Sequence, residues 1–230
     1  PEKGMTAIVG ESGCGKSTVV NMLIGAYRPK AGIVAVGGKP LESVTRESYY
    51  SHIASVSYNT YIFNDTVRAN FELAKQNVSD EEIWAALEKV NLAGFIKENG
   101  GLDKVITEDA NNVSGGQKQR LALAVNLVAD KDIYVFDEAT SNIDIESEAI
   151  IMHNIKAMSA EKAVVVISHR LANVVPADNI YYMEEGEVKE HGSHAQLMSA
   201  QGGYAKLFNA QKQLEEGYKE ITGVAAEVRA

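Results

Sequence analysis

The chain has 230 residues, of which 45% are hydrophobic and 23% charged, and this composition is ordinary for a globular protein with a sizeable core. Its 22 Lys and Arg against 31 Asp and Glu give a formal net charge of −9. That charge argues against a domain that wraps nucleic acid, because such domains carry a basic footprint. The single cysteine, Cys14, excludes an internal disulfide framework and favours a reducing compartment, with the cytosol as the default.

No segment of the sequence is long and apolar enough to cross a bilayer. The longest nearly apolar stretch runs from Leu121 to Ala129 and contains Asn126, whereas a spanning helix needs roughly 20 residues. The first residues also lack the cationic and apolar regions of a secretory signal. We therefore predict a chain that spans no membrane by itself and is not a secreted precursor.

The first sixty residues predict strands alternating with helix. Met5 to Val9 is a short apolar run that ends in glycine, and residues Thr18 to Ala26 carry apolar side chains at helical spacing. Two β-rich runs follow, Ile33 to Val36 and Ile53 to Ser57, and both are bounded by turn residues. This order predicts strand, loop, helix and then two further strands.

The middle third, from about Asn64 to Lys131, predicts a helical insertion. Residues Ser79 to Glu82 have capping-box spacing and open an amphipathic helix, and the pair Gly100-Gly101 interrupts the chain after it.

The last hundred residues return to strand patterns. Ile133 to Phe136 and Ala163 to Ile167 are apolar runs of strand length with a helical pattern between them, as parallel strands joined by crossover helices should be. Asn179 to Glu190 predicts a hairpin that precedes two final helices. The sequence thus predicts an α/β fold with a mainly parallel sheet and an inserted helical part.

A glycine-rich segment between the first predicted strand and helix fits the phosphate-loop pattern G-x-x-x-x-G-K-[ST]. Its glycines let backbone N–H groups curl around an anion, and the following helix adds partial positive charge at its N-terminus. Lys16 would reach the β- and γ-phosphates, and Ser17 would ligate Mg²⁺. A plain glycine-rich turn is disfavoured, because the flanking strand and helix are both present. The expected nucleotide-binding residues are Gly10, Glu11, Ser12, Gly13, Cys14, Gly15, Lys16, Ser17 and Thr18.

A second helix start has the same character. In Val113-Ser114-Gly115-Gly116-Gln117, Ser114 and Gln117 have capping-box spacing, and an apolar helical pattern follows. This glycine-softened helix N-terminus suits an anion. A plain helix cap with incidental glycines remains an alternative.

The run Ile133 to Glu138 delivers two adjacent carboxylates at the end of a buried strand, where ligands of open α/β sheets bind. Asp137 suits second-shell ligation of Mg²⁺, and Glu138 suits polarisation of an attacking water. Taken alone, this pair could be two solvated acids at the end of a strand. The phosphate loop in the same chain disfavours that alternative.

From about Lys3 to Gln213 these segments, in this order, resemble the ATP-binding cassette of ABC transporters. The fold that this resemblance implies is a P-loop NTPase core with an inserted helical subdomain. The matching segments are residues 10–18 with Walker A, 113–117 with the signature LSGGQ, 133–138 with Walker B, 141–144 with the D-loop and 167–170 with the switch strand and its histidine.

The resemblance implies a Mg²⁺-dependent ATPase. Lys16, Glu138 and His169 would be catalytic, Ser17 and Asp137 would hold the metal, and Asp144 would join the signature at the nucleotide. Two such domains would stack head to tail, with each ATP held by Walker A of one chain and by the signature of the other. The dimer would drive a transmembrane domain from the cytoplasmic side of a membrane, and no nucleic acid would be a partner.

The resemblance also implies a division of the chain and a transport class. The ATPase core would comprise residues 1–63 and 131–215, the helical signature subdomain 64–130 and a polar C-terminal tail 216–230. Residues Phe63 to Arg68 and Glu108 resemble the segments through which exporter-type cassettes touch their membrane domain, and this favours an exporter.

The sequence departs from the family pattern at several positions. Tyr58 stands where the family has glutamine, and a neutral phenol is a poor ligand for a hard cation, so both hydrolysis and coupling are affected. Val113 replaces leucine and Val125 replaces arginine. The family's first strands, and the aromatic residue before Walker A that stacks on adenine, are expected upstream of Pro1.

Two other functions stay open. One is an ATP-clamped regulatory or partner module whose own hydrolysis is weak because of Tyr58. The other is a soluble cassette protein that acts on DNA or ribosomes. This second alternative is disfavoured by the charge of −9 and by the short stretch between Lys16 and Ser114, which leaves no room for a long coiled coil.

Overall fold

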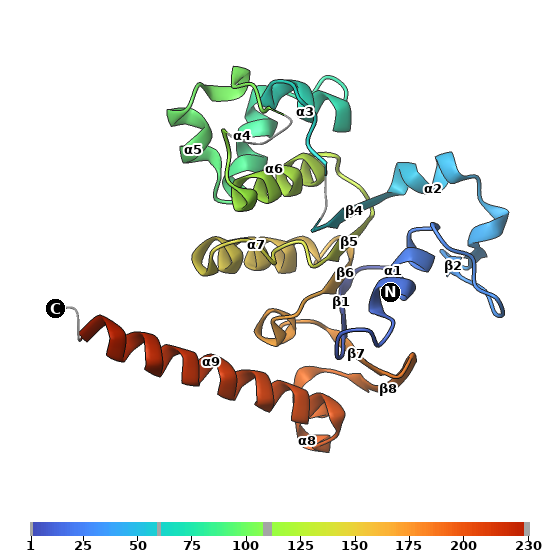
Figure 1. Cartoon of the computed structure of the whole chain (residues 1–230). Coiled ribbons are helices and arrows are strands. Elements are labelled where there is room, and N and C mark those ends of the chain that lie inside the picture. The colour runs from blue at the N-terminus through green and yellow to red at the C-terminus, as the bar shows by residue number, and fades with distance from the viewer. Residues whose placement is uncertain (1, 59–60, 108–111, 228–230) are drawn as a thin grey trace.

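A six-stranded sheet forms the centre of the computed structural model, which describes residues 2–58, 61–107 and 112–227, with side chains up to residue 216 (Figure 1). The strand order is β4-β5-β6-β1-β7-β8, with β8 antiparallel to β7 and all other neighbours parallel. This confirms the predicted mainly parallel α/β fold. The strands are β1 (Gly4–Val9), β4 (Ile53–Ser57), β5 (Ile133–Asp137), β6 (Ala163–Ile167), β7 (Asn179–Glu184) and β8 (Glu187–Gly192).

Successive side chains of a strand point to opposite sides, and helices cover both faces of the sheet over its inner strands. On one face Ile8, Val135 and Ile167 pack with Val20 of α1 (Lys16–Leu23) and Tyr49 of α2 (Arg46–His52). The opposite face belongs to the larger core, which is covered by the helical part and by α7 (Ile145–Met158). The apolar runs in the sequence are therefore strands enclosed on two sides. The strand residues that face the larger core include Met5, Ala7, Val9, Val56, Phe136, Val164 and Val166.

The predicted helical insertion is confirmed between β4 and β5, and it forms the upper part of the molecule in Figure 1. Its longest helix, α6, packs against α3 and α4. The Ser79 capping box is also confirmed: the hydroxyl accepts a hydrogen bond from the Glu82 N–H, and the Glu82 carboxylate accepts one from the Ser79 N–H. The helices are α3 (Val67–Ala74), α4 (Asp80–Lys89), α5 (Ala93–Glu98) and α6 (Gly115–Val128).

Two local predictions differ from the structure, and one helix was not predicted. The first helix begins at Lys16 rather than Thr18, because Gly15 with φ of 103° is its N-cap, and it ends at Leu23. The strand predicted over residues 33–36 shrinks to β2 (Ala35–Val36), which pairs with β3 (Lys39–Pro40) in a separate small sheet. Helix α2 was not predicted: its polar and aromatic sequence has no clear apolar period, and its start is marked only by the N-cap Thr45.

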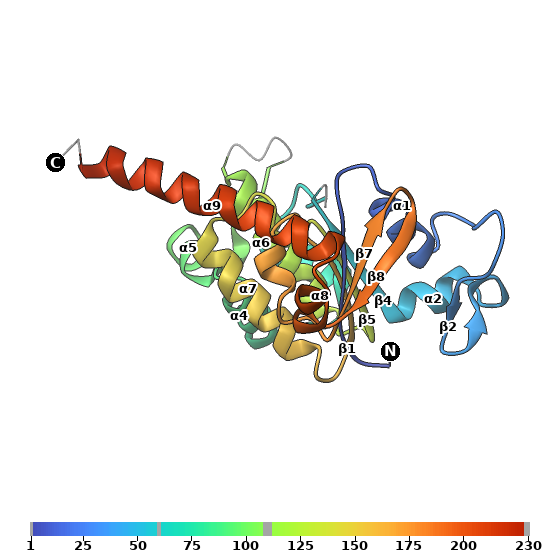
Figure 2. The same cartoon turned by 90° about the horizontal axis from the view of Figure 1, so that it is seen from below.

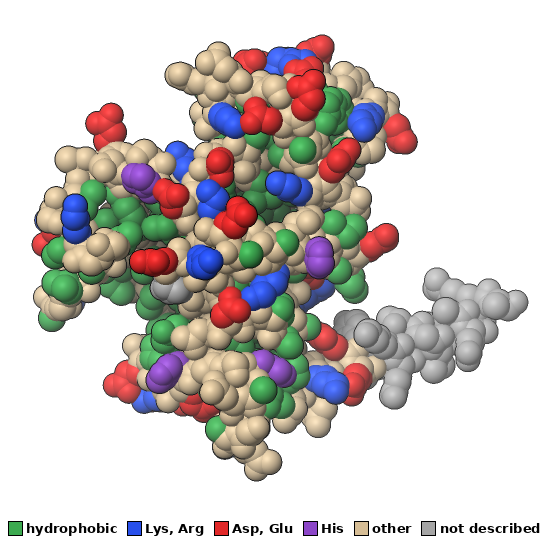
Figure 3. All heavy atoms as spheres, turned by 180° about the vertical axis from the view of Figure 1, so that it is seen from behind, with side chains coloured by type: hydrophobic (Ala, Val, Ile, Leu, Met, Phe, Trp, Pro, Cys, Tyr) green, Lys and Arg blue, Asp and Glu red, His purple; other side chains and the backbone are tan. Residues whose placement is uncertain are grey.

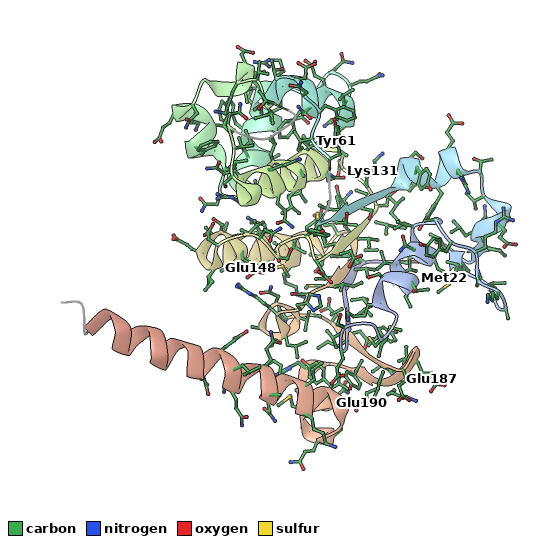
Figure 4. All side chains as sticks on the ribbon, viewed as in Figure 1. Met22, Tyr61, Lys131, Glu148, Glu187 and Glu190 are labelled. Carbon is green, nitrogen blue, oxygen red and sulfur yellow. The ribbon has the colours of Figure 1, made fainter. Side chains whose placement is uncertain are left out.

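The C-terminal elements are the predicted hairpin and two helices, α8 (His194–Ala200) and α9 (Gly203–Glu227). Helix α9 starts beside β8, where the Glu190 carboxylate accepts hydrogen bonds from the N–H groups of Gly203 and Tyr204 (Figure 4). From there α9 runs past α7 and extends away from the body of the molecule (Figures 1 and 2). Residues 216–227, which we expected as a tail, are thus part of this helix. Short 3₁₀ turns cover Leu41–Ser43, Gly101–Asp103 and Leu171–Val174.

Hydrophobic side chains are also exposed at the end of the molecule formed by α2 and β2. They surround a hollow that can be seen in Figure 3, and its lining includes Tyr27, Ile33, Leu41, Tyr49 and Tyr50. Across the described residues no helix combines the length and the apolar character that crossing a membrane requires.

We predict that the helical part is an integral piece of the folding unit. Leu87 on α4 is fully buried and Leu73 on α3 is 66% exposed. Leu87→Ala should therefore lower the free energy of unfolding by about 2–5 kcal/mol through lost burial and a cavity. Leu73→Ala is the matched control and should change it by less than about 0.5 kcal/mol. Urea denaturation followed by circular dichroism measures both, and equal losses would contradict the described packing.

Candidate functional site

The carboxyl ends of β1, β5 and β6 meet at one edge of the sheet. Ile8 is in register with Ile167, and Ile167 with Asp137. The loops that follow these three strands must therefore lie side by side, although they are far apart in the sequence. They enclose a concavity that contains most of the predicted catalytic and phosphate-binding residues. Its lining is Ser12, Gly13, Gly15, Lys16, Ser17, Thr18, Glu138 and His169.

The loop after β1 is hydrogen-bonded to the lysine at its end. Lys16 is buried, and its Nζ donates hydrogen bonds of 2.8 Å to the carbonyl oxygens of both Gly10 and Glu11. The N-cap of α1, Gly15, has no side chain to occupy the N–H groups of the first helical turn, and this turn holds no acidic residue. These N–H groups and the ammonium group together form an environment that favours an anion.

Gly10 has to be a glycine for a steric reason. Its φ is 152°, and a Cβ there would lie 2.1 Å from the Met183 carbonyl oxygen and 2.8 Å from Cys14 Sγ. The Gly186 N–H also donates a hydrogen bond to the Cys14 carbonyl. The β7–β8 hairpin therefore supports the loop from behind, and Cys14 is buried between them.

Glu138 and His169 contact each other across the concavity, with 2.7 Å between Oε1 and Nε2. Glu138 has φ of 53°, a conformation that costs a non-glycine residue about 1–3 kcal/mol. Its N–H donates to the Ile167 carbonyl, which fixes the turn after β5 against the end of β6. The strained turn thus keeps the carboxylate close to the loop that carries the histidine.

Asp137 is the most unusual titratable group of the site. Burial, and next to it the charge of Glu138, raise the pKa of the Asp137 carboxyl, while Lys16 and His169 act in the opposite direction. Its Oδ1 is buried and has no hydrogen-bond partner among the described residues. Buried polar atoms are normally paired, so an orphaned carboxylate oxygen fits a site for a cation.

The predicted signature caps α6, and its capping box is confirmed. The Ser114 hydroxyl accepts a hydrogen bond from the Gln117 N–H, and the Gln117 amide oxygen accepts one from the Ser114 N–H. A Cβ on Gly115 would meet nothing within 4 Å, whereas one on Gly116 would lie 2.8 Å from the Asn142 carbonyl oxygen. Gly115 therefore faces open space, and Gly116 allows the helix to approach the loop after β5.

The structure does not bring the signature to the phosphate loop within one chain. Residues 114–117 do not line the concavity around Lys16. Asp144, which we expected at the nucleotide, is the N-cap of α7, and its carboxylate accepts a hydrogen bond from the Ser147 N–H. This bond, and the Ser147 hydroxyl with it, lower the pKa of the Asp144 carboxyl.

Sequence reasoning missed two buried polar residues that support the site. Gln119 donates to the Glu138 carbonyl and accepts from the Asn142 N–H, so it joins the signature helix to the loop after β5. The carboxylate of Glu148 on α7 is 5% exposed and pairs with Arg170, next to the switch histidine (Figure 4). Thr140 Oγ1 also donates to Glu148 at 2.7 Å.

Tyr58 follows β4 directly and is 57% exposed, outside the lining of the concavity. Two exposed aromatic side chains lie next in the described chain: the rings of Tyr61 and Phe63 meet edge to face at 5.1 Å between centroids (Figure 4). The Phe63 N–H donates to Asn70 Oδ1, which ties this segment to α3. Glu108, predicted to take part in the same contact, lies outside the described residues.

Comparisons with known proteins identify the family of this chain. Residues 1–141 match the family model described as ABC transporter. An uncharacterized ABC transporter ATP-binding protein of Haemophilus influenzae is 46% identical over 212 residues, which are 92% of this chain and 38% of that protein. An ATP-dependent lipid A-core flippase of Pasteurella multocida is 40% identical over 213 residues, covering 91% of this chain and 37% of that protein.

The same similarity is found among solved structures. A bacterial Atm1-family ABC exporter with ATP bound matches with a TM-score of 0.86 and 33% identity, over 91% of this chain and 37% of that chain. The fold predicted from the sequence, a P-loop NTPase core with a helical insertion, is thereby confirmed. This chain spans somewhat more than a third of the length of the curated relatives that it matches. Since the family model covers more than half of its residues, the chain belongs to the ABC transporter family.

Proposed function

We propose that this chain is the ATP-binding and ATP-hydrolysing part of an ABC exporter. The observation that carries the proposal is the gathering of Lys16, Glu138 and His169 around one concavity, with Asp137 at the end of the adjoining strand. Phosphoryl transfer to water needs positioning and charge neutralisation more than covalent chemistry, and these residues are suited to both. The ATP-bound exporter and the ATP-dependent flippase among the similar proteins support the same function.

Each residue would have a separate role in hydrolysis. Lys16 and the N–H groups at the start of α1 would neutralise the phosphates. Glu138 would orient the attacking water and accept its proton, and His169 would hold Glu138 and contact the γ-phosphate. Because Lys16 donates to two carbonyl groups of its own loop, phosphate binding would exchange these hydrogen bonds for stronger, charge-assisted ones.

The donor set also fits Mg²⁺. Ser17 lines the concavity. Asp137 Oδ1, which has no hydrogen-bond partner in the described part of the chain, lies beside it at the carboxyl end of β5. Oxygen ligands of this kind suit Mg²⁺, which keeps several waters and binds through few protein groups. When bound there, the ion would neutralise charge on the β- and γ-phosphates.

The signature supports a head-to-tail dimer. Residues 114–117 present a glycine helix start with open space above Gly115, and they lie apart from Lys16 of the same chain. A second copy turned to face the first would bring its signature over this chain's phosphate loop, and each ATP would then be held by both chains. In this proposal residues 64–130 act as the signature subdomain, and residues 1–63 with 131–215 form the ATPase core.

The exposed aromatic side chains Tyr61 and Phe63 suit contact with a transmembrane domain, together with the segment up to Arg68. Arg68 pairs with Asp80 and holds this segment against α4. Such a contact would place the chain at the cytoplasmic face of a membrane.

Tyr58 favours a second candidate, an ATP-clamped partner module with weak hydrolysis. Its phenol is exposed and outside the concavity, so it offers no strong ligand where the family pattern has glutamine. This candidate shares ATP binding with the first and differs from it only in turnover.

We predict that Glu138→Gln lowers kcat by about 100-fold or more, because the variant keeps the shape of the side chain and loses the group that accepts the proton. The affinity of this variant for ATP, measured by calorimetry, should equal that of the parent chain. Lys16→Ala should instead lose ATP binding, because the phosphates lose their buried cation. Equal turnover in Glu138→Gln and the parent chain, with turnover above background, would contradict the role of Glu138. Tight binding with no turnover in the parent would support the partner module instead.

Asp137→Asn should stabilise the ligand-free chain at pH 7. In the folded chain the pKa of the Asp137 carboxyl is raised above its ordinary value of 3.8. Between the ordinary pKa and the raised one, the folded state binds more protons than the unfolded state, so the folded chain loses stability as the pH rises through this interval. The variant cannot carry the buried charge, and its advantage should vanish below the ordinary pKa of aspartate. Urea unfolding from pH 3 to 8 measures this, with the exposed Asp103→Asn as control. If Asp137→Asn were less stable than the parent at pH 7, the conclusion that the buried Asp137 charge destabilises the fold would be wrong.

A further inference from the structure

We propose that Gln211 on α9 is a positioning residue for the switch histidine, so that the C-terminal helix is coupled to the catalytic concavity. The inference rests on the proposed function, since His169 is placed there as part of the hydrolytic machinery. It concerns a residue that lies on the last helix of the chain, 42 positions beyond the histidine that it contacts.

The side-chain amide of Gln211 uses both of its ends on the backbone of the switch loop. Nε2 donates a hydrogen bond of 2.8 Å to the carbonyl oxygen of His169, and Oε1 accepts one of 3.0 Å from the N–H of Leu171. The two bonds bracket the intervening residue, Arg170. Two hydrogen bonds from one amide restrict the backbone torsions between their partners, because rotation of either peptide plane would break at least one of the two bonds.

The opposite side of the same loop is held by α7. Arg170 pairs with the buried carboxylate of Glu148, and the Ser168 hydroxyl accepts a hydrogen bond from the Arg170 N–H. Glu148 in turn accepts from Thr140, two residues after Glu138. The loop that carries His169 is thus held between two helices. Helix α7 is hydrogen-bonded to the segment that follows Glu138, whereas α9 contributes no described residue to the concavity.

The two holds act on different parts of the loop. The α7 contacts fix the Arg170 side chain, whereas Gln211 fixes the peptide carbonyl of His169 itself. The position of the imidazole depends on this peptide, because its Cα is the anchor of the ring. Loss of Gln211 would leave the Ser168–Arg170 hydrogen bonds in place but remove the bond to the His169 carbonyl, so the ring would be held less firmly at its 2.7 Å contact with Glu138. A displacement of that kind disturbs catalysis more than substrate binding, since near-attack geometry is sensitive to small shifts.

Helix α9 is suited to transmit such a displacement. Its first turn is fixed to β8 by the Glu190 carboxylate, and Gln211 lies two turns further along. Leu171 is buried, and Phe208 of α9 packs against the same core, so the Gln211 hydrogen bonds lie where the helix meets the body of the molecule. A shift of α9 at Gln211 would therefore be passed to the His169 peptide.

The test compares Gln211→Met with Gln213→Met in the full chain. Methionine keeps the length and the helix propensity of glutamine and removes both hydrogen bonds. Gln213 is exposed on the same helix two residues later and serves as the matched control. Gln211→Glu keeps the acceptor for Leu171 but turns a carboxylate oxygen toward the His169 carbonyl, and two acceptors repel, so it should disturb the loop at least as much as Gln211→Met.

The measurements are kcat, KM, calorimetric ATP affinity and the imidazole ¹H–¹⁵N signals of the ligand-free chain, in which His169 is assigned by its loss in His169→Ala. For Gln211→Met we expect a kcat lowered about tenfold with KM and ATP affinity changed less than about twofold. The His169 signal should move in Gln211→Met and stay in place in Gln213→Met.

Three outcomes are decisive. A His169 signal and a kcat in Gln211→Met that equal those of Gln213→Met would overturn the proposal. Equal losses of kcat and ATP affinity would also overturn it, because they indicate general destabilisation. A moved His169 signal, with kcat unchanged in both Gln211→Met and His169→Ala, would support positioning by Gln211 and overturn the catalytic role of His169 instead.

Discussion

The constraint on which this structure depends is that parallel strands place their carboxyl ends at one edge of the sheet. Because β1, β5 and β6 are neighbours in register, the phosphate loop, the Asp137-Glu138 pair and the His169 loop have to meet there. No long-range contact between side chains is needed to assemble them. The buried faces of the sheet, filled by α1 on one side and α7 on the other, supply the stability that keeps this edge in place.

The site contains features that would be unfavourable anywhere else. Asp137 is a buried carboxylate with one oxygen that no described residue hydrogen-bonds, and Glu138 holds a left-handed backbone conformation. Structures retain such features when the surroundings over-determine them. Here the surroundings are Gln119, which bonds the Glu138 carbonyl, and Glu148, which links the loop after β5 to the switch loop. The burial of Asp137 and the backbone strain at Glu138 would both be offset by a cation and a phosphate group, as the proposed function expects.

The sequence predicted the chemistry-bearing segments better than their supports. The Lys16 loop, the Ser114 helix start and the β5 carboxylates are each marked by residue types at fixed spacing and adjacent apolar runs. The strand before the loop, the start of α6 and β5 were therefore predicted to within about one residue, whereas the bounds of α1 were not. Helix α2 and strand β3 were missed because their residues have no apolar period. Gln211 could not be found in this way, since its role arises from a contact over 42 positions that periodicity does not encode. The assignment of residues 114–117 to a nucleotide site rests on the resemblance alone, and in this structure these residues do not line the concavity around Lys16.

The central claim is that one chain carries two half-sites, Lys16 with its loop and the Ser114 helix start, which meet only between two chains. Sedimentation velocity of Glu138→Gln with and without Mg-ATP tests it most directly, because this variant should hold ATP without releasing it by hydrolysis. The account predicts a monomer without nucleotide and a dimer with Mg-ATP. It also predicts that the dimer is lost when Gly115→Glu is added, since a carboxylate would then face the phosphates. A Glu138→Gln chain that binds Mg-ATP and stays monomeric at concentrations well above its affinity for ATP would contradict the account.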